Sequence, residues 1–389
     1  MIKRVLKIVI GIELVYLLLV NGALQLQLTQ DLVNKIRPEK FYVTWEHAWS
    51  WYPFRVYAEG IFANGQARTQ QWEVTATSAS GSISVLPLIL KHVYLSDIQA
   101  ENIDYRQRPR LKPDIDYSSK LAYFPEIQGR EVVPVETAEQ KKKRPWKIHM
   151  NGLQALGDHR FWVYNMQGTA SGTAAGNLYT ETRRGAFWLD VEQFELDLGP
   201  GFLNGNAEAF HGGTAEGSLG FSPLVRAEHP GRRMLRFAYL DADLDLAVDS
   251  LDFINMFAGN LSNFNITGAG RVQGHLSVSD GYVRAGTQLS ATAENLSVDM
   301  YDINVLGKGV VNIHTPETED IPLGLDVQYD QLTATRDGES APFLIGETLH
   351  LEYRGSNFIT PDPGLGLAGL WDDEEARQRR ANNSLSLFV

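Results

Sequence analysis

The sequence predicts a mainly β protein that begins with a transmembrane helix and contains few other helices. Three observations lead to this fold class. Short stretches in which apolar and polar residues alternate recur from about residue 41 onward, as expected for half-buried strands. The 35 glycines supply turns and bulges between them. One longer apolar run lies directly behind basic residues at the N-terminus.

The length, net charge and cysteine content of the chain exclude several classes of function. A chain of 389 residues can bury a large core or build one elongated β structure. Its formal net charge of −12 argues against a protein whose main task is to hold nucleic acid, because such proteins neutralise phosphates with a basic face. There are no cysteines, which excludes disulfides, cysteine-bound zinc and thiol catalysis.

Residues 1–35 are predicted to form a membrane anchor. Three cations, Lys3, Arg4 and Lys7, stand before an apolar run that includes Ile8, Ile12, Leu17 and Leu18. Flanking cations hold that end in the cytoplasm and send the rest of the chain across. The run is short against the roughly 20 residues of a full span, and Glu13 is costly in hydrocarbon. A cleaved signal peptide ending near Ala23 is the competing interpretation, and in both cases the remainder is exported.

Residues 36–108 are predicted to form a first β module. Aromatic side chains crowd residues 41–54, where they suit either a membrane interface or a buried strand pair. Strands are expected at 55–61 and 72–77, with Asn64-Gly65 as a hairpin turn between them. Residues 82–105 then contain a short apolar turn at Pro87 and an alternating strand that carries Val93 and Leu95.

Residues 109–147 differ in character and are interpreted as a Pro-rich basic excursion or linker. The segment contains five prolines and the basic run of residues 141–144. A solvated loop is the favoured explanation of that run, and contact with anionic lipid headgroups is the alternative.

Residues 148–360 are expected to continue the β region. Its clearest strand places Leu240, Leu244, Leu246 and Val248 on one face and three aspartates on the other. The aspartates need no calcium ion to explain them, because period-two spacing accounts for a wet face and no EF-hand loop follows. A short helix is expected at 251–257. Residues 361–389 read as a flexible tail whose last residues suit an edge strand.

No catalytic, metal or cofactor site is indicated. The nine histidines show no ligand spacing, and no nucleophile elbow is present. The glycines of residues 364–369 match a dinucleotide fingerprint but open no βαβ unit. Most carboxylates are explained by strand alternation, so no acid and base pair stands out. The prediction is a protein that is not an enzyme.

Two stretches resemble a known family. The anchor, a strand that ends in Ala58-Glu-Gly60, and residues 74–105 (VTATSASGSISVLPLILKHVYLSDIQAENIDY) look like the opening module of AsmA-like envelope proteins. Residues 244–274, with a strand, a short helix and a Gly-x-Gly-x-Val-x-Gly segment, are similar to the later repeats of AsmA/TamB-type proteins. The resemblance covers residues 1–105 closely and 240–313 loosely.

The resemblance implies an inner-membrane protein of a Gram-negative cell with its bulk in the periplasm. Its implied fold is an elongated, twisted antiparallel sheet that curls into a taco-like groove, and its implied function is phospholipid binding or transfer between membranes. The residues expected to line such a groove are Leu240, Leu244, Leu246, Val248, Val93 and Leu95. A filled sandwich core explains these leucines equally well. The alternative function is a structural or assembly factor in outer-membrane protein or lipopolysaccharide biogenesis, with envelope proteins as partners.

Overall fold

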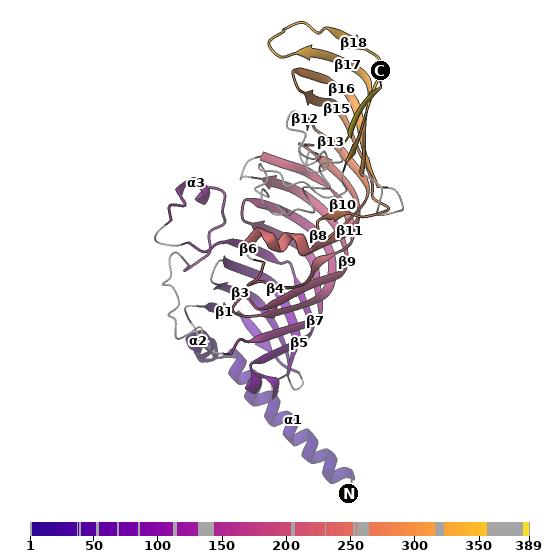
Figure 1. Ribbon diagram of the computed structural model, residues 1–389. Helices are drawn as coiled ribbons and strands as arrows, with labels where there is room; N and C mark the ends of the chain where they lie inside the picture. Colours follow the sequence, from indigo (N-terminus) through magenta and orange to yellow (C-terminus); the bar gives the residue numbers. More distant parts are fainter. Residues whose placement is uncertain are drawn as a thin grey trace. The chain divides into compact units, whose positions relative to one another are not determined.

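The computed structural model describes residues 2–36, 38, 40–51, 54–67, 70–84, 86–111, 115–130, 144–203, 207–229, 231–251, 254, 264–315, 323–355 and 384–388. It confirms a mainly β chain (Figure 1). The chain forms two compact units. Unit 1 comprises Met1–Phe187 with Phe202–Ala207, and unit 2 comprises Trp188–Gly201 with Glu208–Val389. The boundary between the two units falls within residues 148–360, which the sequence pattern predicted as one region. The predicted segment boundaries lie at residues 109 and 147.

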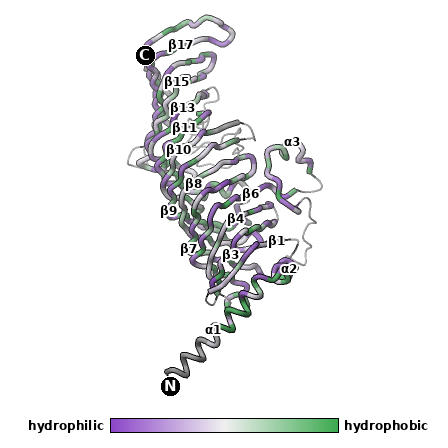
Figure 2. Tube along the Cα trace, turned by 180° about the vertical axis from the view of Figure 1, so that it is seen from behind, coloured by the Kyte–Doolittle hydropathy of each residue, from purple (hydrophilic) through white to green (hydrophobic). Residues whose placement is uncertain are grey.

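Two helices open unit 1, α1 (Ile2–Gln25) and α2 (Gln27–Ile36). Figure 2 shows that the part of α1 nearest the sheet consists mainly of hydrophobic residues. Leu17 is half-buried and Leu18 is exposed, while the side chains of Lys3, Arg4, Lys7, Ile8 and Ile12 lie outside the described residues. In the described part of the chain, no helix is both long enough and apolar enough to span a membrane.

Asparagine and glutamine side chains of α1 and α2 cover the backbone of the sheet's first strands. Asn21 accepts a hydrogen bond from the Ser50 amide at 2.7 Å and donates one to its carbonyl at 3.0 Å. Asn34 makes the same pair of bonds with Val43, both at 2.8 Å. Gln25 and Gln30 donate to the carbonyls of Ala48 and Trp45. These amides satisfy groups that an edge strand otherwise exposes.

The sheet of unit 1 contains β1 (Phe41–Thr44), β2 (His47–Trp49), β3 (Arg55–Gln66), β4 (Gln70–Ser84), β5 (His92–Glu101), β6 (Asp104–Pro109), β7 (Lys147–Val163) and β8 (Met166–Glu181). The strands β1 and β2 pair with β3, β3 pairs with β4, and β4 pairs with both β5 and β6, all antiparallel. The 3₁₀ helix η1 (Leu86–Leu90) lies between β4 and β5, which confirms the turn expected at Pro87.

The sheet is mixed, which corrects the prediction of an antiparallel sheet. Strand β7 runs parallel to β5 and to β6 before it pairs antiparallel with β8. Parallel neighbours need a crossover of a dozen or more residues. The Pro-rich excursion between β6 and β7 supplies that crossover.

The hairpin expected at Asn64-Gly65 is also wrong. Both residues lie inside β3, opposite Glu73 and Trp72 of β4. A Cβ at Gly65 would meet the Trp72 ring, so the glycine makes room for an indole rather than for a turn. The strands join beyond β3 instead, where the Ala67 amide donates to the Gln70 carbonyl at 2.8 Å.

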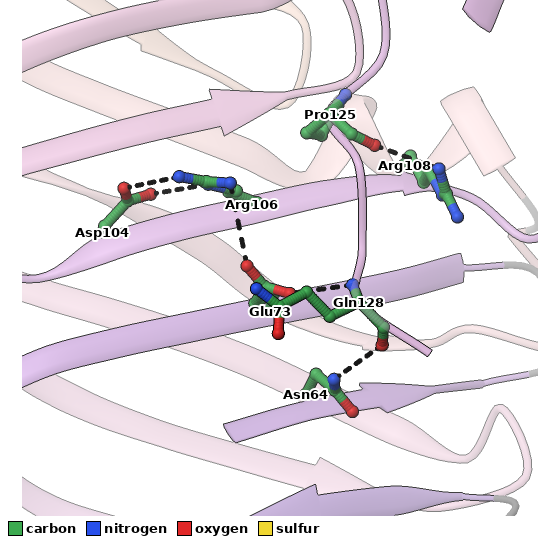
Figure 3. A network of polar contacts seen from close by, with 7 residues as sticks. All are labelled: Asn64, Glu73, Asp104, Arg106, Arg108, Pro125 and Gln128. Atoms are coloured by element: carbon green, nitrogen blue, oxygen red, sulfur yellow. Dashed lines mark hydrogen bonds and ion pairs between the residues drawn. The ribbon is translucent and has the colours of Figure 1, made fainter. Parts of the chain in front are cut away.

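The described part of the excursion packs on unit 1 through a buried polar network (Figure 3). It includes the short helix α3 (Ser118–Leu121). Arg108, only 5% exposed, donates to the carbonyl of Pro125 at 3.2 Å, and Glu73 accepts from the Gln128 amide at 3.0 Å. Asn64 donates to the Gln128 carbonyl at 2.8 Å. Buried polar groups of this kind hold a segment in place when they are paired. Lys141–Lys143 lie outside the described residues.

Unit 2 contains most of β9 (Ala186–Leu203) and β10 (Ala207–Val225), the 3₁₀ helix η3 (Gly231–Phe237), and the strands that follow. These strands are β11 (Ala238–Val248), β12 (Phe264–Thr267), β13 (Gly270–Ser279), β14 (Tyr282–Val283), β15 (Gln288–Met300), β16 (Ile303–His314), β17 (Leu323–Arg336), β18 (Leu344–Gly346), β19 (Leu349–Gly355) and β20 (Ser384–Phe388). The described pairings run antiparallel from β10 through β11, β13, β15, β16, β17 and β19 to β20.

The last strand, β20, pairs with β19, which confirms the edge strand expected at the C-terminus. Most of the predicted flexible tail, residues 361–383, lies outside the described residues, as does the glycine motif within it. Of the short helix expected at 251–257, only Leu251 and Ile254 are described.

Candidate functional site

One face of the unit 1 sheet carries a group of aliphatic side chains that stay partly exposed. We call it the aliphatic face, and its members are Val56, Ile83, Val93, Leu95, Ile98, Ile148, Met150, Leu153 and Leu178. They come from β3, β4, β5, β7 and β8. Because side chains alternate between the two faces of a strand, residues two apart share this face. Ile98 and Leu153 follow Leu95 and Met150 by three positions, and they stay on the face because a register shift lies between the members of each pair.

Strand register aligns four of these side chains in one row. Ile83 of β4 lies opposite Leu95 of β5, Leu95 lies beside Met150 of β7, and Met150 lies opposite Leu178 of β8. With strands about 4.8 Å apart, three spacings give the row a length of about 14 Å. The row is continuous because no polar side chain interrupts it in that register.

A second row on the same face consists of alanines. Ala48, Ala58, Ala79, Ala100, Ala155 and Ala174 are successive partners across β2, β3, β4, β5, β7 and β8. Ala79 and Ile83 share a face of β4 with Gly81 between them, and a Cβ at Gly81 would contact the Ile98 side chain. Gly81 separates this alanine row from the row that contains Ile83, and the alanine methyl groups extend the apolar surface along the strands.

The opposite face of the same strands is aromatic and polar. Tyr94 stacks on His149 with ring centroids 4.1 Å apart, and His149 lies 4.6 Å from Tyr179. Tyr179 donates a 2.5 Å hydrogen bond to Glu181, which also pairs with Lys147 at 3.3 Å. The two faces therefore differ sharply, and the aliphatic side chains are not part of a uniformly apolar sheet.

Local electrostatics agree with this division. Desolvation raises the pKa of Tyr179 to about 12, with the Glu181 carboxylate adding to the effect. The hydrogen bond from Tyr179 lowers the pKa of Glu181. Desolvation, and then the neighbouring His92 and Lys147, lower the pKa of His149. The lowered pKa of His149 favours its neutral imidazole, which lies near the Lys147–Glu181 ion pair.

The far end of the aliphatic face is closed by the excursion. Glu73 and Gln71 share the face of β4 that carries Ile83, and both are buried under residues 123–130. The hydrogen-bonded network there is polar. The open, apolar part of the face is therefore confined to the end nearest η1.

The two sequence-predicted residues of unit 1, Val93 and Leu95, belong to the aliphatic face. Sequence reasoning missed Ile83, Met150 and Leu178, although each lies in an alternating stretch. Alternation shows which residues of one strand share a face, but it does not show which residue of a neighbouring strand lies beside each of them. The register that joins the row is a tertiary property.

The residues predicted in unit 2 have different surroundings. Val248 is 7% exposed within the hydrophobic core, Leu244 and Leu246 pack against that core, and Leu240 is partly exposed opposite Val278. Leu246 opens a row of successive partners, Val272, Ala291, Val311, Val327 and Leu351, which are at most 3% exposed. Leu251 and Ile254, both 0% exposed, fill the same cluster. The described unit 2 face is a filled core.

The aspartates of β11 have basic or polar partners on β13. Asp245 forms an ion pair with Arg271 at 2.6 Å, and Asp243 lies 3.2 Å from His275. A shallow polar depression lies over β9, β10 and β11. Its acidic lining residues are Glu192, Glu195, Glu216, Asp241 and Asp243. Within the described ranges, no cluster of histidines and carboxylates has the arrangement needed to hold a metal ion.

No protein-family model matches this chain, and no curated protein matches its sequence.

Proposed function

We propose that the N-terminal segment of residues 1–35, whose first side chains lie outside the described residues, holds this protein in the inner membrane of a Gram-negative cell. The rest of the chain then faces the periplasm and binds phospholipid acyl chains on the aliphatic face of unit 1. By binding phospholipid in this way, the protein helps to transfer it between membranes along an apolar β-groove. The observation that carries the proposal is the row of Ile83, Leu95, Met150 and Leu178, which remains partly exposed. No comparison with known proteins bears on the proposal.

The energetics of the face suit a lipid tail. Each methylene removed from water contributes roughly 0.8 kcal/mol. A tail that lies along the row, with the alanines beside it, can bury many methylenes without meeting an unpaired polar group. A polar ligand would gain little there, because the side chains of the face offer it no hydrogen-bond partners.

The contacts of α1 support a retained anchor over a cleaved signal peptide. Cleavage near Ala23 would remove Asn21, which holds both backbone groups of Ser50, and Tyr16, whose hydroxyl bonds Ser50 Oγ at 2.8 Å. Leu14, Leu18 and Leu19 on the same helix are 56%, 76% and 69% exposed, which is favourable in an apolar medium.

Mass spectrometry of lipids that co-purify with the full chain in mild detergent tests the function. We expect phospholipid with the wild type and a clear loss in the double variant Leu95→Gln/Met150→Gln. The control is Ser96→Gln, which places the same amide on the opposite face of β5. Phospholipid at background level in the wild type, or undiminished in the double variant, would contradict acyl-chain binding on this face.

The alternative, an envelope assembly factor that binds proteins, is favoured by one observation in unit 2. Its apolar face is filled, yet Tyr301, Phe343 and Ile345 are 77%, 50% and 75% exposed, and β18, which carries Ile345, pairs with β17. A photo-crosslinking residue at position 345 should give protein adducts if this function holds. The same residue at position 95 should give lipid adducts if phospholipid binding holds.

A further inference from the structure

A second group of apolar side chains lies at one end of unit 1, outside the aliphatic face. We call it the apolar tip and define it as Trp51, Phe54, Leu86, Ile89 and Leu90. Their exposed fractions are 66%, 54%, 81%, 82% and 58%. Three of them stand on η1, a turn too short to bury any of its residues. Large apolar side chains exposed to this extent mark a contact surface when they are grouped.

Backbone hydrogen bonds place these side chains together and next to α1. The Ile83 amide, just before η1, donates to the Phe54 carbonyl at 2.9 Å. The Phe54 amide in turn donates to the hydroxyl of Tyr16 on α1 at 3.2 Å. The tip therefore continues the exposed leucines of α1 onto the sheet.

The loops around the tip are basic. Lys91 follows η1, and its carbonyl accepts from the Lys147 amide at 3.0 Å, so the start of β7 lies beside the end of η1. Lys147 faces Glu181 at the end of β8, and the turn that follows carries Arg183 and Arg184. Arg55 and Arg144 add two more cations at this end. This local excess stands out in a chain whose net charge is −12.

We propose that the apolar tip inserts into the headgroup layer of an anionic phospholipid bilayer, the same bilayer that holds α1. Interfacial membrane-binding segments combine tryptophan, phenylalanine and leucine at the membrane–water boundary with cations on the side facing the headgroups. Each cation near an anionic surface adds attraction. This contact goes beyond the proposed function, because it would fix the orientation of unit 1 on the membrane and bring the open end of the aliphatic face to the lipids.

The absence of cysteine from the sequence allows a direct test with the full chain. Three single-cysteine variants, Leu18→Cys, Ile89→Cys and Met166→Cys, carry a nitroxide label, and the protein is reconstituted into vesicles of phosphatidylethanolamine and phosphatidylglycerol. Met166 is 48% exposed and opens β8, whose other end is Glu181. At about 3.3 Å per residue, it lies about 50 Å along the strand from the tip. Label depth follows from relative accessibility to oxygen and to a water-soluble nickel chelate.

We expect the label at position 89 to shift toward oxygen accessibility, at headgroup depth, while position 166 stays aqueous. A label at position 89 that matches position 166 would overturn the docking of the tip. Position 18 reports the anchor separately, because an aqueous signal there overturns insertion of α1, whatever position 89 shows. In a second measurement, Leu86→Glu/Ile89→Glu should return a label at Leu90→Cys to water, and Met166→Glu should not. An unchanged label depth at position 90 would overturn the proposal as well.

Discussion

The clamp of Asn34 on Val43 gives the most quantitative prediction. The side-chain amide of Asn34 donates to the Val43 carbonyl and accepts from the Val43 amide, each at 2.8 Å. The asparagine thus takes the place of a neighbouring strand at the edge of β1. Asn34→Ala removes both bonds and leaves the backbone groups of Val43 beside a half-buried gap.

The cost follows from the number of bonds. Each neutral hydrogen bond contributes about 1 kcal/mol net, so the pair is expected to stabilise the closed edge by about 2 kcal/mol. A difference of 1.4 kcal/mol changes an equilibrium tenfold. Local opening of β1, and with it exchange of the Val43 amide hydrogen, should therefore accelerate by about 30-fold.

Hydrogen exchange followed by mass spectrometry on peptides that cover β1 measures this effect in the full chain. Gln27→Ala is the matched control, because Gln27 is an exposed amide on the same helix, α2. The control should leave exchange in β1 within about twofold of the wild type, as surface substitutions change stability by less than about 0.5 kcal/mol. Equal exchange in the Asn34→Ala and Gln27→Ala variants would refute the edge-capping role of the asparagine.

Three further predictions concern stability. Val327 is 0% exposed, so Val327→Asp should make unit 2 sensitive to limited proteolysis by burying an unpaired carboxylate, and Gln328→Asp on the exposed side should not. Gly213→Ala should destabilise unit 2 by about 1–3 kcal/mol in urea unfolding, because the new Cβ would collide with the Asp245 carbonyl and the Gly213 φ is +149°. Gly346→Ala is the control, because its Cβ would meet no atom closer than Leu332 Cγ at 3.8 Å. The lowered pKa of His149 means that the folded state binds fewer protons than the unfolded state, so unit 1 should lose stability as pH falls below about 6.5. Hydrogen exchange in β7 from pH 5 to 8 should show this loss, and His149→Phe should reduce it; an unchanged slope would exclude the imidazole as its source.

The chain by itself determined the local β character of this protein. Alternation predicted β11 at Leu240–Val248 and the strand that carries Val93 and Leu95, and Pro87 marked the 3₁₀ turn. These features depend on a residue and its neighbours two to four positions away, and such short-range patterns are visible in a single sequence.

Only the tertiary structure decided which strands stand side by side and which apolar faces remain open. The parallel pairing of β7 with β5, the row from Ile83 to Leu178, and the filling of the unit 2 core by Leu251 and Ile254 all join residues distant in sequence. Val327 and Leu95 both lie in alternating stretches, yet Val327 is 0% exposed in a closed core and Leu95 stays partly exposed. Whether a face is buried depends on which other segments of the chain pack against it, and a local sequence pattern does not show those contacts.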